Sequence, residues 1–154
     1  MGIMDAIDEA ILRQLQDDAR RTNRAVAAAV GVSPTTALDR TRALVERGVI
    51  RGTSVDVDLS AVGRGVQALI AIRIRPPSRD RIEGFRDWAA SRAEVLGVFV
   101  TAGTEDFTLH VAVADNQALY AFVVDELTSR REVADVRTSV VYEHLRSPAT
   151  RLPR

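Results

Sequence analysis

Arginine provides every basic side chain of this protein, and guanidinium groups are well suited to bind phosphates and bases. The 154 residues include 21 arginines, no lysine and 21 acidic residues, so the formal net charge is zero. The charge is uneven, because residues 19–53 hold seven arginines against two acidic residues, a local charge of +5. Arginine pairs with phosphate oxygens and with O6 and N7 of guanine. This local excess predicts a nucleic-acid-binding surface.

Eight polar side chains of this region are candidates for contacts with DNA. Arg40 and Arg42 can bind bases or phosphates, and Asp39 can accept from cytosine N4 or pair with Arg42. Thr35 and Thr36 fall at an expected helix N-terminus, where free N–H groups favour a phosphate. A solvated helix face would show the same residue types. The surrounding elements must therefore decide between a DNA-binding surface and a plain solvated face. The complete set is Ser33, Thr35, Thr36, Asp39, Arg40, Arg42, Arg47 and Arg51.

Few residues are suited to catalysis or to metal binding. The absence of cysteine and lysine excludes thiolate metal sites, a cysteine nucleophile, a Schiff-base lysine and a P-loop lysine. The two histidines, His110 and His144, lack the spacing of a metal-binding pair. Glu105 and Asp106 are adjacent in an expected turn, where acidic side chains are usually solvated. We therefore predict no catalytic residue, no metal and no cofactor, and a protein that is not an enzyme.

The candidate DNA contacts fall within an expected helix-turn-helix. Apolar residues spaced three and four apart predict a helix over residues 5–18, and an alanine-rich helix is expected over residues 23–30, ended by a glycine. Ser33 and Pro34 are typical of an N-cap and a first helical position, so a third helix begins there and runs to about Arg47. Helices joined by a glycine-containing turn are typical of DNA-binding domains.

The third helix is expected to have one buried and one exposed side. Its apolar residues, Ala37 and Leu44 among them, share one arc of the helix. Arg40, Arg42 and Arg47 are expected on the opposite, exposed arc together with the other polar candidates. The glycine turn, the capping signal and the local charge together favour DNA binding over a plain solvated face.

The residues after the third helix predict a wing and a linker. Residues 49–58 alternate around a glycine, as in a short β-ribbon. Two glycines within residues 59–65 indicate a linker. We therefore expect a winged helix-turn-helix domain over residues 1–58, followed by a second domain.

The second half of the chain predicts an α+β fold. Strands and helices follow one another as β-α-β-β-α-β, the ferredoxin-like pattern, and short connections favour an antiparallel sheet with both helices on one face. This domain is expected over residues 66–146, with a tail at 147–154. The expected strands are 66–75, 94–102, 107–114 and 135–145, and the expected helices are one capped by Ser78 and one over 116–129.

The other face of this sheet is expected to contact a second copy of the chain. Leu69 and Ala71 alternate with Ile70 and Ile72, so the first strand is apolar on both sides. A sheet face in contact with water normally carries polar residues. An apolar second face therefore predicts a homodimer.

Three motifs occur in order along nearly the whole chain. They are Asp5-x-x-Asp8-x-x-Ile11-Leu12-x-x-Leu15-Gln16-x-Asp18-Ala19-Arg20, then Gly31-Val32-Ser33-Pro34 with Arg40-x-Arg42-x-Leu44-x-x-x-Gly48-Val49-Ile50, and then Gly103-Thr104-Glu105-Asp106. The first resembles the opening of the Lrp/AsnC, or feast/famine, transcription regulators. The second resembles their recognition helix and wing entry, and the third resembles the turn of their ligand-binding domain.

This resemblance implies a winged helix-turn-helix joined to an amino-acid-sensing βαββαβ domain of the RAM type. It implies double-stranded promoter DNA as a partner, dimers that assemble into octamers, and a small effector, commonly an amino acid, bound between dimers. The effector contacts expected from it are Gly103, Thr104, Glu105, Asp106 and Thr138.

The turn at residues 103–106 has chemistry that suits a zwitterion. Glycine allows close backbone approach, free N–H groups can hold a carboxylate, and Asp106 can accept from an α-ammonium group. A plain hairpin turn in which Asp106 caps its own backbone would have the same sequence. The residues alone leave both interpretations open.

These features predict a sequence-specific transcription regulator whose assembly or DNA affinity changes with a small effector. The alternative is a DNA-independent metabolite-binding module or a small enzyme built on the ferredoxin-like half. No apolar run reaches the roughly 20 residues of a membrane-spanning helix, and no secretory signal is evident. A cytoplasmic protein without a membrane partner is therefore expected.

Overall fold

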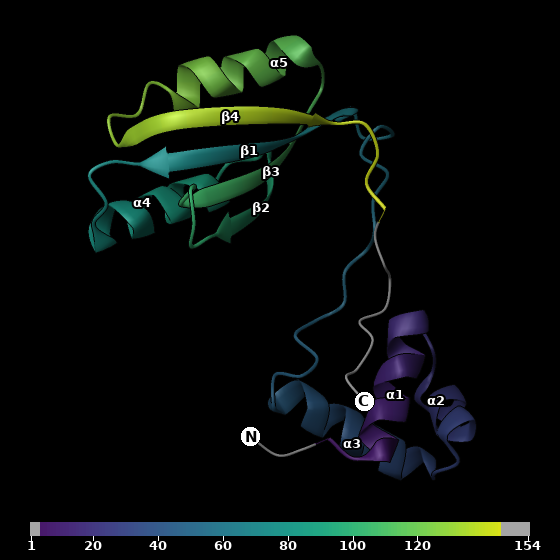
Figure 1. Cartoon of the computed structure of the whole chain (residues 1–154). Coiled ribbons are helices and arrows are strands. Elements are labelled where there is room, and N and C mark those ends of the chain that lie inside the picture. The colour runs from purple at the N-terminus through teal and green to yellow at the C-terminus, as the bar shows by residue number, and fades with distance from the viewer. Residues whose placement is uncertain (1–3, 146–154) are drawn as a thin grey trace. The chain divides into compact units, whose positions relative to one another are not determined.

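The computed structural model describes residues 4–145 and separates into two compact units (Figure 1). The first unit extends to Val55, and the second spans Asp56–His144. Each unit has its own hydrophobic core. Within residues 4–145, no helix is both long enough and apolar enough to span a bilayer.

Three helices form the first unit, and each begins at a side-chain cap. Asp5, Thr22 and Ser33 each accept a hydrogen bond from backbone N–H groups of the first turn. Gly31 ends the second helix with φ of 80°, a left-handed conformation that favours glycine. The predicted helices are confirmed. They are α1 (Ala6–Asp17), α2 (Asn23–Val30) and α3 (Pro34–Glu46).

The core of the first unit is small. Ile11 of α1, Val26 of α2 and Leu44 of α3 are buried together, and a few partly buried apolar side chains pack around them. A unit of about 50 residues buries a smaller fraction of its surface than a larger domain does. Polar contacts between its helices therefore contribute a larger share of its stability.

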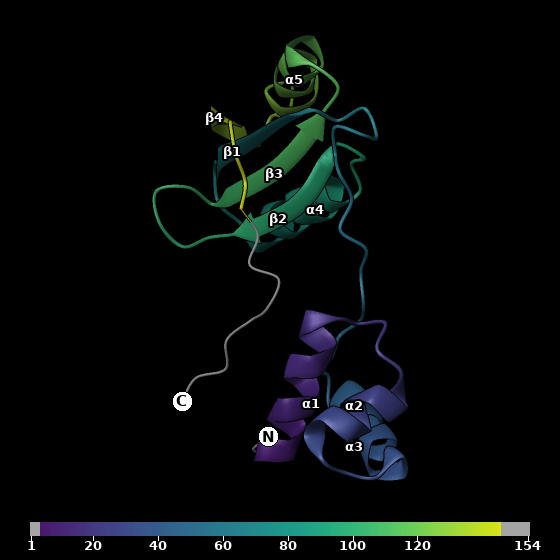
Figure 2. The ribbon, with the colours of Figure 1, turned by 90° about the vertical axis from the view of Figure 1, so that its right-hand side faces the viewer.

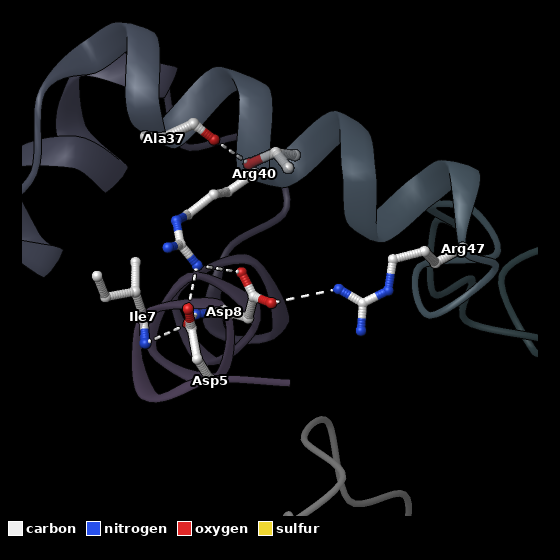
Figure 3. Close-up of polar contacts among 7 residues, drawn as sticks. Asp5, Ile7, Asp8, Ala37, Arg40 and Arg47 are labelled. Atoms are coloured by element: carbon white, nitrogen blue, oxygen red, sulfur yellow. Dashed lines mark hydrogen bonds and ion pairs between the residues drawn. The ribbon is translucent and has the colours of Figure 1, made fainter. Parts of the chain in front are cut away.

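Four charged side chains join the start of α1 to α3 (Figure 3). Asp8 is only 7% exposed, and its two oxygens accept hydrogen bonds from Arg40 at 2.9 Å and from Arg47 at 3.3 Å. Asp5 accepts a second hydrogen bond from Arg40 at 2.6 Å, while its other oxygen caps α1. We refer to Asp5, Asp8, Arg40 and Arg47 as the ion cluster. It compensates the buried charge of Asp8 on both oxygens.

The ion cluster also shifts the ionisation of its members. Hydrogen bonds from the Asp8 N–H group and then from the Arg40 side chain lower the pKa of the Asp5 carboxyl. Hydrogen bonds to Asp5 and Asp8 raise the pKa of the Arg40 guanidinium. Both shifts favour the charged forms. The contact between Asp5 and Arg40 is therefore an ion pair at neutral pH.

The second unit is a four-stranded antiparallel sheet with two helical segments (Figure 2). The strand order across the sheet is β2-β3-β1-β4, and the chain order β-α-β-β-α-β confirms the predicted fold. The last strand begins and ends earlier than predicted. The elements are β1 (Val66–Ile74), α4 (Arg79–Ala90), β2 (Val95–Val100), β3 (Phe107–Val113), α5 (Asn116–Ala121), the π-helical η1 (Phe122–Leu127) and β4 (Val133–Val141).

Both helical segments cover the same face of the sheet, as predicted. Ile70 of β1 and Leu109 of β3 are buried in one cluster with Phe85 of α4 and Leu119 of α5. Phe85 also contacts Phe107 of β3, with ring centroids 4.8 Å apart. This single core fixes both helices on the sheet.

The opposite face carries both apolar and polar side chains. Leu69 and Phe99 are exposed there, and Phe99 has 57% of its surface accessible. Strand pairing places His110 and Ser139 on either side of Leu69. The face is therefore less apolar than the alternation within β1 predicts, because the neighbouring strands contribute polar residues.

The second helix of this unit changes its winding midway, where the sequence predicts one continuous helix over residues 116–129. The N–H group of Thr128 donates to the carbonyl of Val123, five residues earlier, at 2.9 Å. Phe122 and Leu127 are five positions apart and both are buried. The wider π-helical turn brings both side chains onto the sheet.

The β-ribbon expected over residues 49–58 is not formed, because that segment contains no strand. A ribbon needs two segments that pair through backbone hydrogen bonds, and alternation of side chains does not provide a partner. Val55 is 86% exposed, so the segment also lacks an apolar surface to pack against. The prediction that residues 49–58 pair as a β-ribbon was therefore wrong.

Replacing Asp8 with asparagine should destabilise the first unit selectively. The variant loses the charge that compensates Arg40 and Arg47, and hydrogen bonds to charged groups contribute about 1.5–3 kcal/mol. We expect the urea midpoint of the first unit, followed by far-UV circular dichroism, to fall. The fluorescence of Trp88, the only tryptophan, reports the second unit and should keep its midpoint.

Asp17→Asn, an exposed change in the last turn of α1, is the matched control for Asp8→Asn. It removes the same charge without touching the ion cluster. Equal urea midpoints for the two variants would show that the cluster adds nothing to stability.

Candidate DNA-binding surface and effector site

The N-terminus of α3 is fixed by hydrogen bonds on two sides. The Ser33 hydroxyl accepts from the Thr36 N–H group at 3.0 Å and lies 2.8 Å from the Thr36 hydroxyl. The Asn23 side-chain amide donates to the carbonyl of Pro34 at 2.6 Å and thereby ties α2 to α3. Helix N-termini attract anions through their free N–H groups. Ser33, Thr35 and Thr36 thus lie at the one end of α3 that favours phosphate.

One side of α3 is exposed along its whole length. Thr35, Asp39 and Arg42 are spaced four and three residues apart, so they share this side, and all three are exposed. Ala37 and Leu44 face the core from the other side. Within residues 4–145, the Arg42 side chain makes no hydrogen bond or ion pair, which leaves all five of its N–H donors available.

Arg40 and Arg47 do not share this exposed side, contrary to the sequence prediction. Both belong to the ion cluster, where they bind Asp8 of α1, and Arg40 also binds Asp5 (Figure 3). They are seven residues apart, two helical turns, and so lie together on the flank of α3 that faces α1. The prediction treated them as surface residues because a helical wheel contains no information on the neighbouring helix.

The ion cluster lowers the positive charge available to DNA. Two of the seven arginines counted in residues 19–53 are neutralised by the two α1 carboxylates, which precede that window. Arg42 and Arg51 are exposed and remain as candidate DNA contacts. The spacing Asp5-x-x-Asp8 was the sequence signal for this pairing, since it places one acid at the N-cap and one in the first turn of α1.

The turn at residues 103–106 is a closed hairpin end between β2 and β3. The Thr101 N–H group donates to the carbonyl of Asp106 at 2.9 Å, and the Thr101 hydroxyl donates to the carbonyl of Glu105 at 2.8 Å. The Thr104 hydroxyl donates to the Glu105 carboxylate at 2.6 Å. Apart from the two chain neighbours of Gly103, no atom of the described residues lies within 4 Å of the space a Cβ would take there. The turn is therefore held by hydrogen bonds at Thr101, Glu105 and Asp106, and it has free space beside Gly103.

Asp106 connects this turn to the end of β1. Its carboxylate accepts from the backbone N–H of Ile74 at 2.7 Å and lies 3.6 Å from the Arg75 guanidinium. Its own N–H group donates to the carbonyl of Ile72 at 3.0 Å. Asp106 thus caps a neighbouring strand, whereas the plain-turn interpretation had it cap its own backbone.

The structure does not bring Thr138 to the turn. Thr138 of β4 pairs with Ile70 of β1. The turn joins β2 to β3, and β1 lies between these two strands and β4. The β4 side chain that reaches the turn is its neighbour Arg137, which forms an ion pair with Glu105. Arg75 and Arg137 are the two arginines beside this turn, and the effector contacts expected from the sequence include neither. Consecutive strand residues point to opposite faces, so Arg137 and Thr138 lie on opposite faces of β4.

The two histidines lie close to each other in the second unit. The rings of His110 and His144 are 5.4 Å apart in an edge-to-face arrangement, and His110 Nε2 is 2.9 Å from the Gln67 side-chain oxygen. Within residues 4–145, no group of three or more His, Cys, Asp or Glu side chains could hold a metal ion.

Family models match both units of the chain. The model described as winged helix-turn-helix DNA-binding matches residues 4–51, which contain α1 to α3. The model described as the Lrp/AsnC ligand binding domain matches residues 67–149, which is more than half of the chain. The second match includes the turn at residues 103–106.

Known proteins are similar over nearly the whole chain. The HTH-type transcriptional regulator AldR of Mycolicibacterium smegmatis is 44% identical over 93% of this chain and 84% of its own length. AldR of Mycobacterium tuberculosis is 41% identical over 95% of this chain and 82% of its own length. A transcriptional regulator of Neisseria meningitidis, solved as an L-Met complex, has a TM-score of 0.87 at 31% identity and covers 94% of both chains.

These relatives are transcription regulators and not enzymes, which removes the alternative of a small enzyme. The helix-turn-helix match also speaks against a module that works without DNA. The architecture, the two family matches and the identities agree on one assignment. The chain belongs to the Lrp/AsnC family of DNA-binding transcriptional regulators.

Proposed function

We propose that this regulator binds operator DNA as a homodimer through the exposed side of α3, and that an amino acid changes its assembly or DNA affinity. One observation carries the DNA part. Arg42 is exposed on the same side of α3 as Thr35 and Asp39, and within residues 4–145 it has no protein partner. A helix with a free arginine and exposed hydroxyl side chains at its N-terminus suits the major groove.

The residues of α3 divide into two groups in this proposal. Arg42 and Asp39 are placed to contact base edges, and Ser33 with Thr35 and Thr36 is placed to contact a phosphate at the helix N-terminus. Arg51 is exposed after α3 and adds a backbone contact. Arg40 and Arg47 hold α3 against α1 and act on DNA binding only through the position of the helix.

Arg42→Ala should weaken operator binding and leave the first unit stable. A lost base contact costs about 1–3 kcal/mol, roughly 5- to 150-fold in affinity, and a lost phosphate contact lowers the salt slope by about 1. Fluorescence anisotropy with a duplex from the protein's own promoter region, titrated at several salt concentrations, measures both quantities.

Arg13→Ala, an exposed arginine of α1, is the control for Arg42→Ala. Arg40→Ala should lower the urea midpoint as well as the affinity, because it opens the ion cluster. Unchanged affinity and salt slope for Arg42→Ala would contradict the assignment of this side of α3 to DNA.

The open face of the sheet is the proposed dimer surface. Leu69 and Phe99 are exposed in its middle strands and at its β2 edge, while polar residues lie around them. Apolar side chains ringed by polar ones are typical of protein interfaces. A dimer presents two copies of α3, so a pseudo-palindromic operator with half-sites about 34–36 Å apart, or at multiples of that spacing, is expected. Assembly of dimers into octamers extends the same proposal.

Phe99→Glu should shift the regulator from dimer toward monomer. The change places an unpaired charge in an apolar contact, which desolvation makes unfavourable. Light scattering of the wild type at micromolar concentration should give at least twice the monomer mass of 16.8 kDa. Tyr120→Glu, at an exposed aromatic residue of α5, is the control. A wild type of 16.8 kDa would refute dimerisation.

The turn at residues 103–106 is the proposed amino-acid site, and Glu105 and Asp106 supply its acceptors. The Neisseria meningitidis relative was solved with L-Met, which supports an amino acid as the class of ligand. Glu105 and Asp106 each already contact an arginine, Arg137 and Arg75. An α-carboxylate can bind these guanidinium groups while an α-ammonium binds the acids. An octamer would place this turn at a contact between dimers.

Asp106→Asn should abolish or weaken amino-acid binding at least tenfold. Asparagine keeps an oxygen to accept from the Ile74 N–H group, so the strand contact survives while the charge that would bind the ammonium group is lost. Thermal shift across the amino acids identifies the ligand, and calorimetry then compares wild type and variant. Asp87→Asn, at an exposed residue of α4, is the control. Equal binding by Asp106→Asn would place the effector elsewhere.

A further inference from the structure

A cavity of about 540 Å³ lies in the second unit between two chain connections and α4. One connection leads from β1 into α4 through Arg75 and Pro76, and the other leads from η1 into β4 through residues 130–132. The first half of α4 completes the wall with Arg81 and Gly84. The volume falls in the range of small-molecule sites. No residue of the 103–106 turn lines this cavity.

Positive charge dominates the lining of this cavity. Four arginines contribute to it, against two carboxylates, those of Asp80 and Glu132, so the lining carries a net charge of +2. The four arginines are Arg75, Arg81, Arg130 and Arg131. Such a concentration is notable in a chain whose total charge is zero. Cavities lined by one sign of charge attract ligands of the opposite sign.

Two of these arginines are held in place by the protein. The Arg130 guanidinium lies 4.3 Å from the centre of the Trp88 ring and 2.5 Å from the Glu132 carboxylate. Arg75 donates through its side chain to the carbonyl of Ile74 at 2.6 Å, and its backbone N–H donates to the carbonyl of Glu132 at 2.9 Å. A guanidinium fixed in this way loses little freedom when it binds an anion.

The other two arginines keep donors for a ligand. Among the residues that the structure describes, the Arg81 side chain makes one hydrogen bond, to the carbonyl of Pro76 at 3.3 Å. Arg131 is exposed, and its side chain makes no hydrogen bond or ion pair within residues 4–145. Each guanidinium has five N–H groups and binds carboxylate or phosphate through paired hydrogen bonds.

Gly84 keeps the cavity open on the side of α4. It lies inside a helix, where glycine is disfavoured relative to alanine, and its backbone angle does not require glycine. Apart from its chain neighbours and the backbone of α4 itself, no atom of residues 4–145 lies within 4 Å of the space that a Cβ would take there. The protein therefore leaves room for a ligand to approach the helix backbone.

The lowered pKa of the Glu132 carboxyl reflects the positive charge around the cavity. Burial alone would raise the pKa of its carboxyl, yet its own backbone N–H, the Arg130 side chain and the charge of Arg81 together lower it. The ionised carboxylate is thus stabilised by the same arginines that face the cavity.

We propose that this cavity binds a small polyanion, a metabolite with at least two phosphate or carboxylate groups. Arg130 and Arg75 supply fixed donors, Arg81 and Arg131 close on the ligand from the rim, and Gly84 lets it approach α4. The cavity shares Arg75 with the proposed amino-acid site, where Arg75 pairs with Asp106, whereas Arg81, Arg130 and Arg131 belong to the cavity alone. Pyrophosphate and citrate probe the two chemical classes of ligand.

Calorimetry of the full chain with each probe tests the proposal. We expect pyrophosphate or citrate to bind with one site per chain. Tighter binding of pyrophosphate would identify a phosphate ligand, and tighter binding of citrate a carboxylate ligand. Arg131→Gln and Gly84→Leu should each weaken binding at least tenfold, by loss of a cation and by filling the cavity. Arg79→Gln, whose arginine is highly exposed and pairs with Glu83 outside the cavity, should bind as the wild type does.

Arg42→Gln separates this site from the DNA-binding surface, which also attracts anions. Binding that survives Arg42→Gln and is lost in Arg131→Gln supports the cavity. Binding that is lost in Arg42→Gln and kept in Arg131→Gln overturns it, as does the absence of heat with both probes at millimolar concentration. Circular dichroism and Trp88 fluorescence check that Gly84→Leu is folded, and Arg131→Gln together with Arg81→Gln decides the outcome if it is not.

Discussion

The buried carboxylate of Asp8 fixes α3 against α1 and thereby determines which side of α3 is exposed. Its two oxygens bind arginines that are two helical turns apart, so the contact constrains both the rotation and the tilt of the helix. The apolar core beside it contains few fully buried side chains. Arg40 and Arg47 are consequently structural, and the positive charge that remains for DNA is smaller than the local charge of +5 counted over residues 19–53.

The second unit uses carboxylates in the same way at the end of its sheet. Asp106 caps the N–H group of Ile74 and pairs with Arg75, while Glu105 pairs with Arg137 of β4. The acids that an amino acid would contact therefore already hold three strands together. A ligand that replaced these ion pairs would alter the contacts at this end of the sheet. Binding could in this way change how copies of the chain assemble.

Signals from neighbouring residues made much of this fold predictable. The features that depend on contacts between distant elements could not be predicted from the sequence. Ser33 and Pro34 marked the start of α3 because capping involves only neighbouring residues. Arg40 was misplaced because its partner is 35 residues away on another helix. Arg137 was not expected beside Glu105 because the register of β4 follows from pairing with β1. The β-ribbon expected over residues 49–58 is absent because alternation alone does not supply a strand partner.

The π-helical turn of η1 has a consequence for how this chain can vary in length. Phe122 and Leu127 both reach the core because the wide turn accommodates one residue more than an α-helix would between them. Without that residue, the two side chains would be four positions apart, the spacing at which α-helical residues share a face. The gene could therefore lose one codon here while the protein retains both of its anchors in the core.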